Sequence, residues 1–532
     1  MVFSRIKAAV YWSPGRLRIQ GHRRRGSVAR YAPASVPFAI ALLPLGIAVG
    51  WIVVLRRSSM GGAAAGLATA LILVVLAPGY GLGLEPIWLG LLRGALVASI
   101  VAYVLFFGVL LARLMSEGRG EARLAGLLAH LPGDRAARAM ILAIPIGAFF
   151  ESVSGFGVGV AVVGPLLAGL RLAPRQVGTL ALLSQNAVPW GAAAVGIVFS
   201  AALTGLPLID ISVGCTLLLA LALPLYPLTA LGVAGGRPAL RSHGVLAVAI
   251  GAGMAAATYV GAHVAGTELA IVVGGPLVAV GAIAATALTR GRSNDDERAS
   301  VWQAVRGATP ALIPFATLIA VMLSSRAIEP LHRWLGDRAV LEVEAITFRL
   351  PILQSAGTAL AIACLVAIAT LQISRETVVA QVGRSFALWM RSTFTLICFT
   401  AMAELMLRSG MTTAIATTMA SNLLGSYAIA APILGGLSGF LTGSNAGGTA
   451  MLLSLQVQAA ERAGLPIPIV VAAQNAAASA FSMASPGRVV LAAALCGERD
   501  AEGSLMRFGA VLCAGVLLLM IVAILLWLTL AA

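Results

Sequence analysis

Uncharged apolar segments of about twenty residues recur along the whole 532-residue chain. Three of them, 36–55, 269–288 and 350–371, contain no charged residue at all. An apolar helix of about 20 residues crosses the hydrocarbon core of a bilayer, and within lipid a helix satisfies its own backbone hydrogen bonds. Because 59% of the residues are hydrophobic and only 11% are charged, we predict an all-α polytopic membrane protein.

Two apolar stretches, 139–170 and 428–460, are too long for one crossing and too short for two. Gly and Ser interrupt each near its middle, in ESVSGFGVG (151–159) and TGSNAGG (442–448). Arms of roughly 13 residues rise about 20 Å, which is less than a bilayer core of about 30 Å. We therefore predict two re-entrant helical hairpins beside about twelve membrane spans. The predicted spans are 36–55, 61–77, 86–111, 177–203, 211–231, 244–260, 269–288, 308–323, 350–371, 385–407, 467–495 and 508–530.

The distribution of arginines between the spans predicts the topology. With the first span starting outside, the inner loops hold 19 arginines and the outer loops hold 6, as the positive-inside rule requires. The basic tail 1–35 is the exception, and we interpret it as an interfacial segment or a sequence upstream of the true start, not as a signal peptide. In this topology the two hairpins enter the membrane from opposite sides.

The two halves of the chain therefore form an inverted repeat. In each half a hairpin is followed by a span that Gln-Asn interrupts, in SQNAVPWG (184–191) and in AQNAAAS (473–479). Inverted repeats with broken helices are typical of secondary transporters, whose site lies between the repeats. The predicted parts are the tail (1–35), two scaffold spans (36–85), repeat 1 (86–231), central linking spans (232–376) and repeat 2 (377–532).

Four broken elements, the two hairpin tips and the two interrupted spans, are predicted to meet at a substrate site. Helix N-termini carry partial positive charge and suit a carboxylate, while Ser, Thr, Asn and Gln side chains can bind its hydroxyl group. The alternative is that these small residues only let helices pack closely. The candidate substrate-binding residues are Ser154, Gly155, Phe156, Gly157, Gln185, Asn186, Gly443, Ser444, Asn445, Thr449, Gln474, Asn475 and Ser485.

Charged residues at membrane depth are candidates for coupling or charge recognition. Glu151 precedes the first tip and could take up a coupling proton, or it could be a hydrogen-bonded structural carboxylate. Arg391 could bind a substrate carboxylate or extend to the inner interface, and Arg488 lies just after the N-terminal signal Ser485-Pro486. We interpret Arg93 and Glu404, nearer to span ends, as structural.

Other site chemistries are not indicated. The histidines form no metal-binding pattern, and the five cysteines resemble small buried hydrophobes. The net charge of +16 is explained by loop arginines, so we expect no nucleic-acid partner. We expect no cofactor, and a coupling ion that is H⁺ or, alternatively, Na⁺.

Four motifs, in order, resemble the L-lactate permease family of 2-hydroxymonocarboxylate transporters. They are FFESVSGFGVGVAVVGPLLAGLRLAP, NAVPWGAAAVG, FLTGSNAGGTAMLLSLQ and VAAQNAAASAFSMASPG. The resemblance implies import of small carboxylates with protons or sodium ions. The chain departs from the family pattern in the motifs themselves, with Asn445 for Asp, Thr449 for Asn, Ala187 for Thr and Ser482 for Lys.

Together these features predict a secondary active transporter that imports a small organic anion such as lactate or glycolate by H⁺ symport. We expect it in the bacterial inner membrane, either as a monomer or as a homodimer. A Na⁺-coupled di- or tricarboxylate transporter of the same architecture is the alternative, and a channel or an intramembrane enzyme is a remoter one, since no paired aspartates, HExxH or Ser/His arrangement occurs.

Overall fold

Helices make up nearly all of the chain that the computed structural model describes, which is residues 38–128, 130–155, 157–288, 295–346, 348–423, 426–496 and 501–531. Within these residues, nine helices are long and apolar enough to cross a membrane, and five shorter apolar helices accompany them. The prediction of an all-α polytopic membrane protein is confirmed. The basic tail 1–35 and Phe156 lie outside the described residues.

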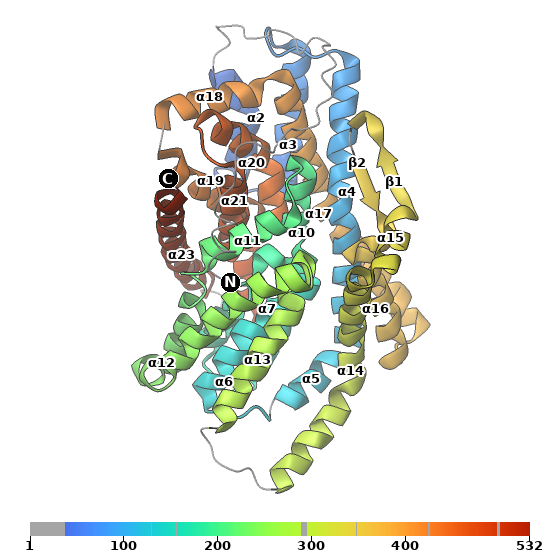
Figure 1. Ribbon diagram of the computed structural model, residues 1–532, viewed down its shortest axis with the longest axis vertical. Helices are drawn as coiled ribbons and strands as arrows, with labels where there is room; N and C mark the ends of the chain where they lie inside the picture. The colour runs from blue at the N-terminus through green and yellow to red at the C-terminus, as the bar shows by residue number, and fades with distance from the viewer. Residues whose placement is uncertain are drawn as a thin grey trace.

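The elements of the first half of the chain run from the first described helix to the end of the central helices (Figure 1). They are α2 (Phe38–Val53), α3 (Ser59–Leu76), α4 (Leu84–Glu117), α5 (Gly120–Leu128), α6 (Arg135–Ile141), η1 (Leu142–Ile146), α7 (Gly147–Ser154), α8 (Val158–Ala168), α9 (Pro174–Leu183), η2 (Val188–Trp190), α10 (Gly191–Thr204), α11 (Leu208–Leu219), α12 (Leu225–Val264), η3 (Thr267–Leu269) and α13 (Ala270–Leu288).

The second half begins with a long helix and contains the one small sheet seen in the described residues. Its elements are α14 (Asp295–Ala327), α15 (Glu329–Asp337), β1 (Val340–Val343), η4 (Glu344–Ile346), β2 (Phe348–Pro351), η5 (Ile352–Gln354), α16 (Ala356–Thr370), α17 (Arg375–Ser409), α18 (Met411–Leu423), α19 (Tyr427–Thr442), α20 (Asn445–Arg462), α21 (Ile467–Ser482), α22 (Pro486–Ala494) and α23 (Ala501–Ala531).

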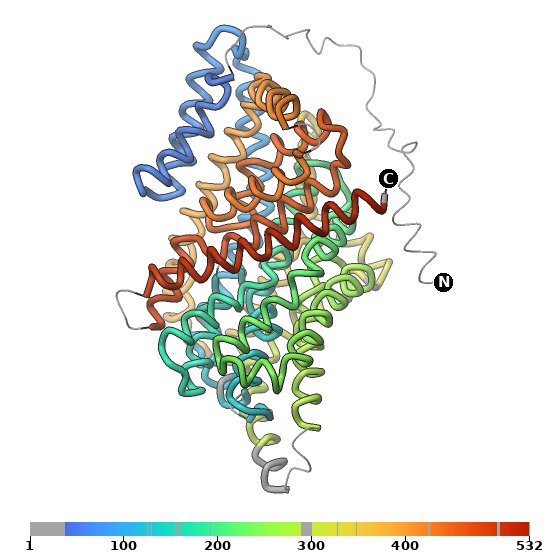
Figure 2. Tube along the Cα trace, turned by 90° about the vertical axis from the view of Figure 1, so that its left-hand side faces the viewer, coloured from blue at the N-terminus to red at the C-terminus, as the bar shows by residue number. Residues whose placement is uncertain are grey.

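Long helices frame the molecule. Helices α4 and α17 pack along each other, with α16 against α4 and α14 against α16 (Figure 1). The two long helices approach closely because Gly94 has no side chain, so that a Cβ there would lie 2.6 Å from the Cα of Ala401. Figure 2 shows α23 crossing the molecule obliquely, and it packs against helices of both halves, including α9, α11, α19 and α21.

Each apolar stretch that was too long for one span folds as two helical arms joined at a glycine turn, and the first arm of the first stretch runs through α6, η1 and α7. In the first, α7 ends at Ser154 with Gly155 (φ 66°) as its C-cap, and α8 begins after Gly157 (φ 85°). In the second, α19 ends at Thr442 with Gly443 (φ 66°) as its C-cap, and Ser444 caps α20 by accepting a hydrogen bond from the Gly447 N–H. Positive φ favours glycine, which explains why these motifs are glycine-rich.

The two interrupted spans break at different places relative to their Gln-Asn pairs. The first span breaks at the pair, because α9 ends at Leu183 and Pro189 lies in the short helix η2 that follows. In the second, α21 continues through Gln474 and Asn475 and ends only at Ser482. The expectation of an interruption at the second Gln-Asn is therefore wrong, since the helix-breaking proline is Pro486 and lies beyond the pair.

Two predicted spans also differ from the observed helices. Segment 211–231 is divided by a turn between α11 and α12, and the predicted loop 232–243 lies inside α12, which bends at Gly236 (φ 64°). Segment 350–371 begins in β2, which pairs antiparallel with β1, so that its helix α16 is shorter than predicted. The gap between two apolar runs predicts a loop at 232–243, although a long helix can carry the arginines of this segment at the membrane surface.

The first hairpin is anchored at its start by Asp134. The Asp134 side chain accepts a hydrogen bond from the Ala137 N–H (2.8 Å), and its Oδ2 lies 2.8 Å from Nε2 of His243 on α12. Burial by itself raises the pKa of Asp134, but the hydrogen bonds from Ala137 and His243 outweigh it, so the pKa lies below its ordinary value. Asp134 is therefore an N-cap that also joins α6 to α12.

We expect Asp134→Ala to lower the free energy of unfolding by about 1 kcal/mol near neutral pH, because it removes a helix cap. A carboxyl whose pKa is lowered on folding stabilises the folded state above its ordinary pKa of about 4, and that contribution is lost as the pH falls further. Thermal unfolding of the detergent-solubilised protein should therefore show a difference that shrinks in acid. Asp337→Ala, on an exposed side chain, should change stability little at any pH.

Candidate substrate-binding site

A buried ion pair lies where the two halves of the chain meet. Glu151, on the last turn of α7, and Arg488, on the first turn of α22, are 1% and 6% exposed. The Nη1 atom of Arg488 lies 3.0 Å from Oε1 of Glu151. Of the arginine side chains that the structure describes, Arg488 is the one that is buried. Because an unpaired buried charge costs several kcal/mol, each residue of this pair requires the other.

Arg488 connects all four broken elements. Its Nη1 also donates a hydrogen bond to Oε1 of Gln185, which lies at the break between α9 and α10. Its Nε donates to the carbonyl oxygen of Gly443 at the tip of the second hairpin (3.2 Å). One guanidinium thus contacts the end of α7, the first broken span and the second tip, and it is itself carried by the second broken span.

The N-terminus of α8 faces the Glu151 carboxylate. The backbone N–H groups of Gly157 and Gly159 donate to its two oxygens at 3.4 and 3.3 Å. A Cβ at Gly159 would lie 3.3 Å from Oε2 of Glu151 and 3.1 Å from Oγ of Ser184. Glycine at this position therefore lets the positive end of a helix approach the carboxylate.

A second polar cluster joins hairpin 2 to both broken spans. Asn475 is fully buried; its Nδ2 donates to Oγ of Ser200 on α10 (2.7 Å), and its Oδ1 accepts from Nδ2 of Asn445 (3.1 Å). Oγ1 of Thr449 donates to Oδ1 of Asn445 at 3.4 Å. Sequence reasoning missed Ser200, and its only signal was a serine within an apolar helix. A Cβ at Gly196 would lie 2.1 Å from Nδ2 of Asn445, which shows how closely α10 and α20 approach.

Gln474 lies in a separate network inside hairpin 2. Its Nε2 donates to Oγ of Ser438 (2.9 Å), and its Oε1 accepts from Nε2 of Gln456. The hydroxyl of Tyr427 donates to Oε1 of Gln456 (2.9 Å). These contacts join α19, α20 and α21, and sequence reasoning missed Ser438, Gln456 and Tyr427. Both ends of the Gln474 amide are used in this network, away from Arg488.

Three buried polar atoms of the candidate residues have no hydrogen-bond partner among the described residues. They are Nε2 of Gln185, Oγ of Ser485 and Oδ1 of Asn186. Ser485 lies against the second tip, since a Cβ at Gly443 would be 3.1 Å from its Oγ. An amide donor and a hydroxyl beside a guanidinium are suitable groups for binding a carboxylate that carries a neighbouring hydroxyl.

The remaining predicted residues whose side chains the structure describes form no side-chain hydrogen bond to Arg488 or Asn475. Ser154 ends α7, and Asn186 donates to the carbonyl oxygens of Ile144 (3.2 Å) and Leu183 (3.0 Å) at the first break. Arg391 is exposed on α17 and lies outside the buried clusters, so the structure does not bring it to the other candidates. Its exposure agrees with the alternative in which the arginine extends to the membrane interface.

The backbone near the first break is strained. Ala193 and Ala194 have φ values of 54° and 61°, in a region that non-glycine residues seldom adopt. They lie between Gly191, where a Cβ would be 3.6 Å from the carbonyl oxygen of Glu151, and Gly196 beside Asn445. Strain of this kind is concentrated at functional sites, and here it lies between the two polar clusters.

Glu404, the other carboxylate that is buried among the described residues, belongs to the frame. It forms an ion pair with Arg93 of α4, and Nε of Arg408 lies 3.6 Å from its Oε2. This arrangement joins α4 to α17, in keeping with the structural interpretation of Arg93 and Glu404. Ser482, where the family pattern has lysine, is buried and donates to the carbonyl oxygen of Ser479 on its own helix.

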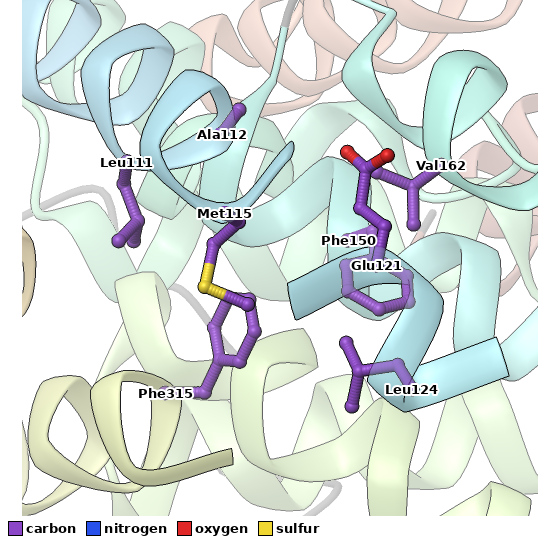
Figure 3. Close-up of a pocket in the computed structure, with 8 residues that line it drawn as sticks. All are labelled: Leu111, Ala112, Met115, Glu121, Leu124, Phe150, Val162 and Phe315. Carbon is purple, nitrogen blue, oxygen red and sulfur yellow. The ribbon is translucent and has the colours of Figure 1, made fainter. Parts of the chain in front are cut away.

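A small apolar cavity lies near the site, lined by residues of α4, α5, α7, α8 and α14 (Figure 3). Its volume of about 10 Å³ is roughly that of one water molecule, which is too small for an organic acid. Glu121 is its titratable lining residue, with a carboxylate that points toward Val162 in Figure 3. Burial raises the pKa of Glu121, and a hydrogen bond with Ser116 opposes the shift.

Metal binding has no support in the part of the chain that the structure describes. No three His, Cys, Asp or Glu side chains gather there closely enough to hold a metal ion. The buried clusters consist instead of one ion pair with amides, hydroxyls and helix termini.

The fold and the site together define a polytopic α-helical membrane protein in which two helical hairpins and two broken helices meet around a buried ion pair. The sequence model of the L-lactate permease family matches residues 37–333 and 339–531. The chain therefore belongs to the L-lactate permease family, which confirms the resemblance predicted from its motifs.

Individual relatives cover most of the chain. It is 27% identical over 531 residues to an L-lactate permease of Bacillus subtilis (strain 168), across 88% of this chain and 92% of the relative. It is 24% identical over 454 residues to an L-lactate permease of Escherichia coli (strain K12), across 77% and 81%. It is 23% identical over 455 residues to a glycolate permease of the same strain, also across 77% and 81%.

We expect Asn475→Ala to reduce substrate counterflow at least about tenfold while the protein still reaches the membrane, because a fully buried donor and acceptor are lost and Asn445 and Ser200 lose their partner. The measurement is counterflow in proteoliposomes with equal amounts of folded protein. Ser479→Ala is a matched control on the same helix, since the buried Ser479 hydroxyl has no partner among the described residues. Full activity in Asn475→Ala would show that this cluster does not serve transport.

Proposed function

We propose that the protein is a secondary active transporter that imports a small 2-hydroxymonocarboxylate, such as lactate or glycolate, by H⁺ symport across the bacterial inner membrane. The observation that carries the proposal is the guanidinium of Arg488, the one buried among the described arginines, at the junction of four broken helix elements. Membership of the L-lactate permease family and likeness to a glycolate permease support the substrate class.

The charge at the site favours a monocarboxylate over the di- or tricarboxylate alternative. Arg488 is the one buried cation among the described residues, and Glu151 already balances it. One carboxylate matches one guanidinium bidentately, whereas a second or third carboxylate on the same substrate would enter without a buried counter-charge. Oγ of Ser485 and Nε2 of Gln185 have no hydrogen-bond partner among the described residues, and they would bind the 2-hydroxyl group beside the guanidinium.

The test is counterflow with the purified full-length chain in proteoliposomes preloaded with unlabelled acid. Labelled L-lactate, D-lactate, glycolate, succinate and citrate are supplied outside, with a pH gradient or a sodium gradient imposed separately. We expect lactate or glycolate to exchange, and an inwardly directed proton gradient to drive accumulation without sodium. Exchange of citrate or succinate alone, or drive by sodium alone, would favour the sodium-coupled alternative, and product formation from a labelled acid would favour an enzyme.

A further inference from the structure

The coupling mechanism can be inferred from the ion pair, given the proposed function. We propose that the substrate carboxylate and Glu151 compete for Arg488, so that Glu151 must take up one proton for each carboxylate bound. The proposal concerns the residue that couples transport to protons and the stoichiometry that follows. It rests on three features of the pair: the small number of charged groups around it, its charge balance and its shared guanidinium.

The elements that pack against α7 carry few charged groups, and Glu121 of α5 lines the small cavity beside Phe150. Helices α8, α10 and α13, which pack against α7, contain no Asp, Glu, Lys, Arg or His, and η1 and η2 contain none either. Helix α4, which also packs against α7, carries four charged residues. Arg93 pairs with Glu404, Glu117 lies 3.7 Å from Arg384, and the other two are Glu85 and Arg113. Within the described residues, the ion-pair partner of Glu151 is Arg488.

Charge balance then determines what must accompany the substrate. The pair of Glu151 and Arg488 is neutral, and adding a carboxylate would leave one uncompensated negative charge in a buried site. Such a charge costs several kcal/mol. If one proton binds to Glu151, the site holds one guanidinium, one substrate carboxylate and one neutral carboxyl, and its net charge is again zero. One proton therefore enters with each monocarboxylate, and both are released together when the ion pair re-forms.

The exchange would take place on the Arg488 guanidinium, which is held at two of its nitrogens. Its Nε is held by the Gly443 carbonyl oxygen, and its Nη1 is shared between Glu151 and Gln185. A protonated Glu151 gives up its charge-assisted bond, so a substrate carboxylate can take its place on the guanidinium. The unpartnered atoms Gln185 Nε2 and Ser485 Oγ supply further polar contacts beside it. The guanidinium stays bound to the second hairpin tip throughout.

The decisive variant is Glu151→Gln, which keeps the shape of the side chain but cannot ionise. Purified full-length protein is studied in proteoliposomes with labelled lactate. In the wild type we expect electroneutral uptake of one proton per lactate, read with a pH-sensitive dye trapped inside, and about tenfold accumulation per unit of pH gradient. In Glu151→Gln we expect counterflow to persist. The ratio of internal to external lactate under a pH gradient should fall to about one. Net uptake of lactate should increase when the vesicle interior is made electrically positive.

Glu404→Gln is the matched control, because it neutralises the other buried carboxylate, which pairs with Arg93 away from the site. The folded fraction of Glu404→Gln should still accumulate lactate when a pH gradient is imposed. Accumulation driven by pH in Glu151→Gln would overturn the coupling mechanism while leaving the proposed function intact. If Glu151→Gln does not fold, the wild type still tests the coupling mechanism. Uptake of more or less than one proton per lactate, or electrogenic uptake, would overturn that mechanism. Absence of counterflow in the wild type with every acid would instead contradict the proposed function.

Discussion

Replacing Arg488 by Gln should abolish lactate uptake and lower the free energy of unfolding by about 3–5 kcal/mol, the typical cost of breaking a buried ion pair by removing one partner. Glu151 would remain 1% exposed without its counter-charge. Thermal unfolding of the purified protein in nanodiscs and counterflow in proteoliposomes measure the two effects.

The double variant Glu151→Gln with Arg488→Gln separates stability from transport. It removes both charges together, so most of the lost stability should return, while uptake remains absent because no guanidinium is left to bind a carboxylate. Arg333→Gln is the control for the loss of an arginine, since Arg333 pairs with Glu329 on an exposed helix surface, where an ion pair contributes at most about 1 kcal/mol. Wild-type uptake by Arg488→Gln would exclude Arg488 from the site.

Gly439→Ala should be among the most destabilising single-methyl changes in the described chain. A Cβ at Gly439 would lie 2.0 Å from the carbonyl oxygen of Ala478 and 2.5 Å from its carbonyl carbon. Both partners are backbone atoms of packed helices, so α19 and α21 would have to separate, at a cost near the upper end of the usual range of about 1–3 kcal/mol. That separation would also disturb Gln474 and Asn475, so the variant should lose counterflow together with its folded structure.

Gly281→Ala provides the comparison for Gly439→Ala. Gly281 also lies within an apolar helix, α13, but a Cβ there meets no atom within 4 Å. We expect this variant to be as stable as the wild type or slightly more stable, because alanine favours a helix over glycine by about 1 kcal/mol. Size-exclusion profiles and apparent melting temperatures of the two variants measure the difference. Equal size-exclusion profiles and melting temperatures for Gly439→Ala and Gly281→Ala would mean that α19 can shift without loss of stability.

Much of the architecture was predictable because its signals are local. Runs without charge indicated the spans, and glycine-rich interruptions indicated the two hairpins, since a turn at positive φ requires glycine at Gly155 or Gly443. The Ser485-Pro486 pair likewise predicted the start of α22. The position of the second break was predicted wrongly from Gln-Asn, because amides are compatible with a helix and the proline that ends it lies further along.

The site depended on contacts that no local pattern records. The sequence by itself determined the class of protein, the hairpins and a pool of candidates that included Glu151, Arg488 and Asn475. Only the tertiary structure decided that Arg488 pairs with Glu151, 337 residues away, that Gln474 belongs to an internal network, and that Arg391 is exposed. The physical reason is that backbone conformation follows from neighbouring residues, whereas the partner of a buried charge is determined by how distant helices pack.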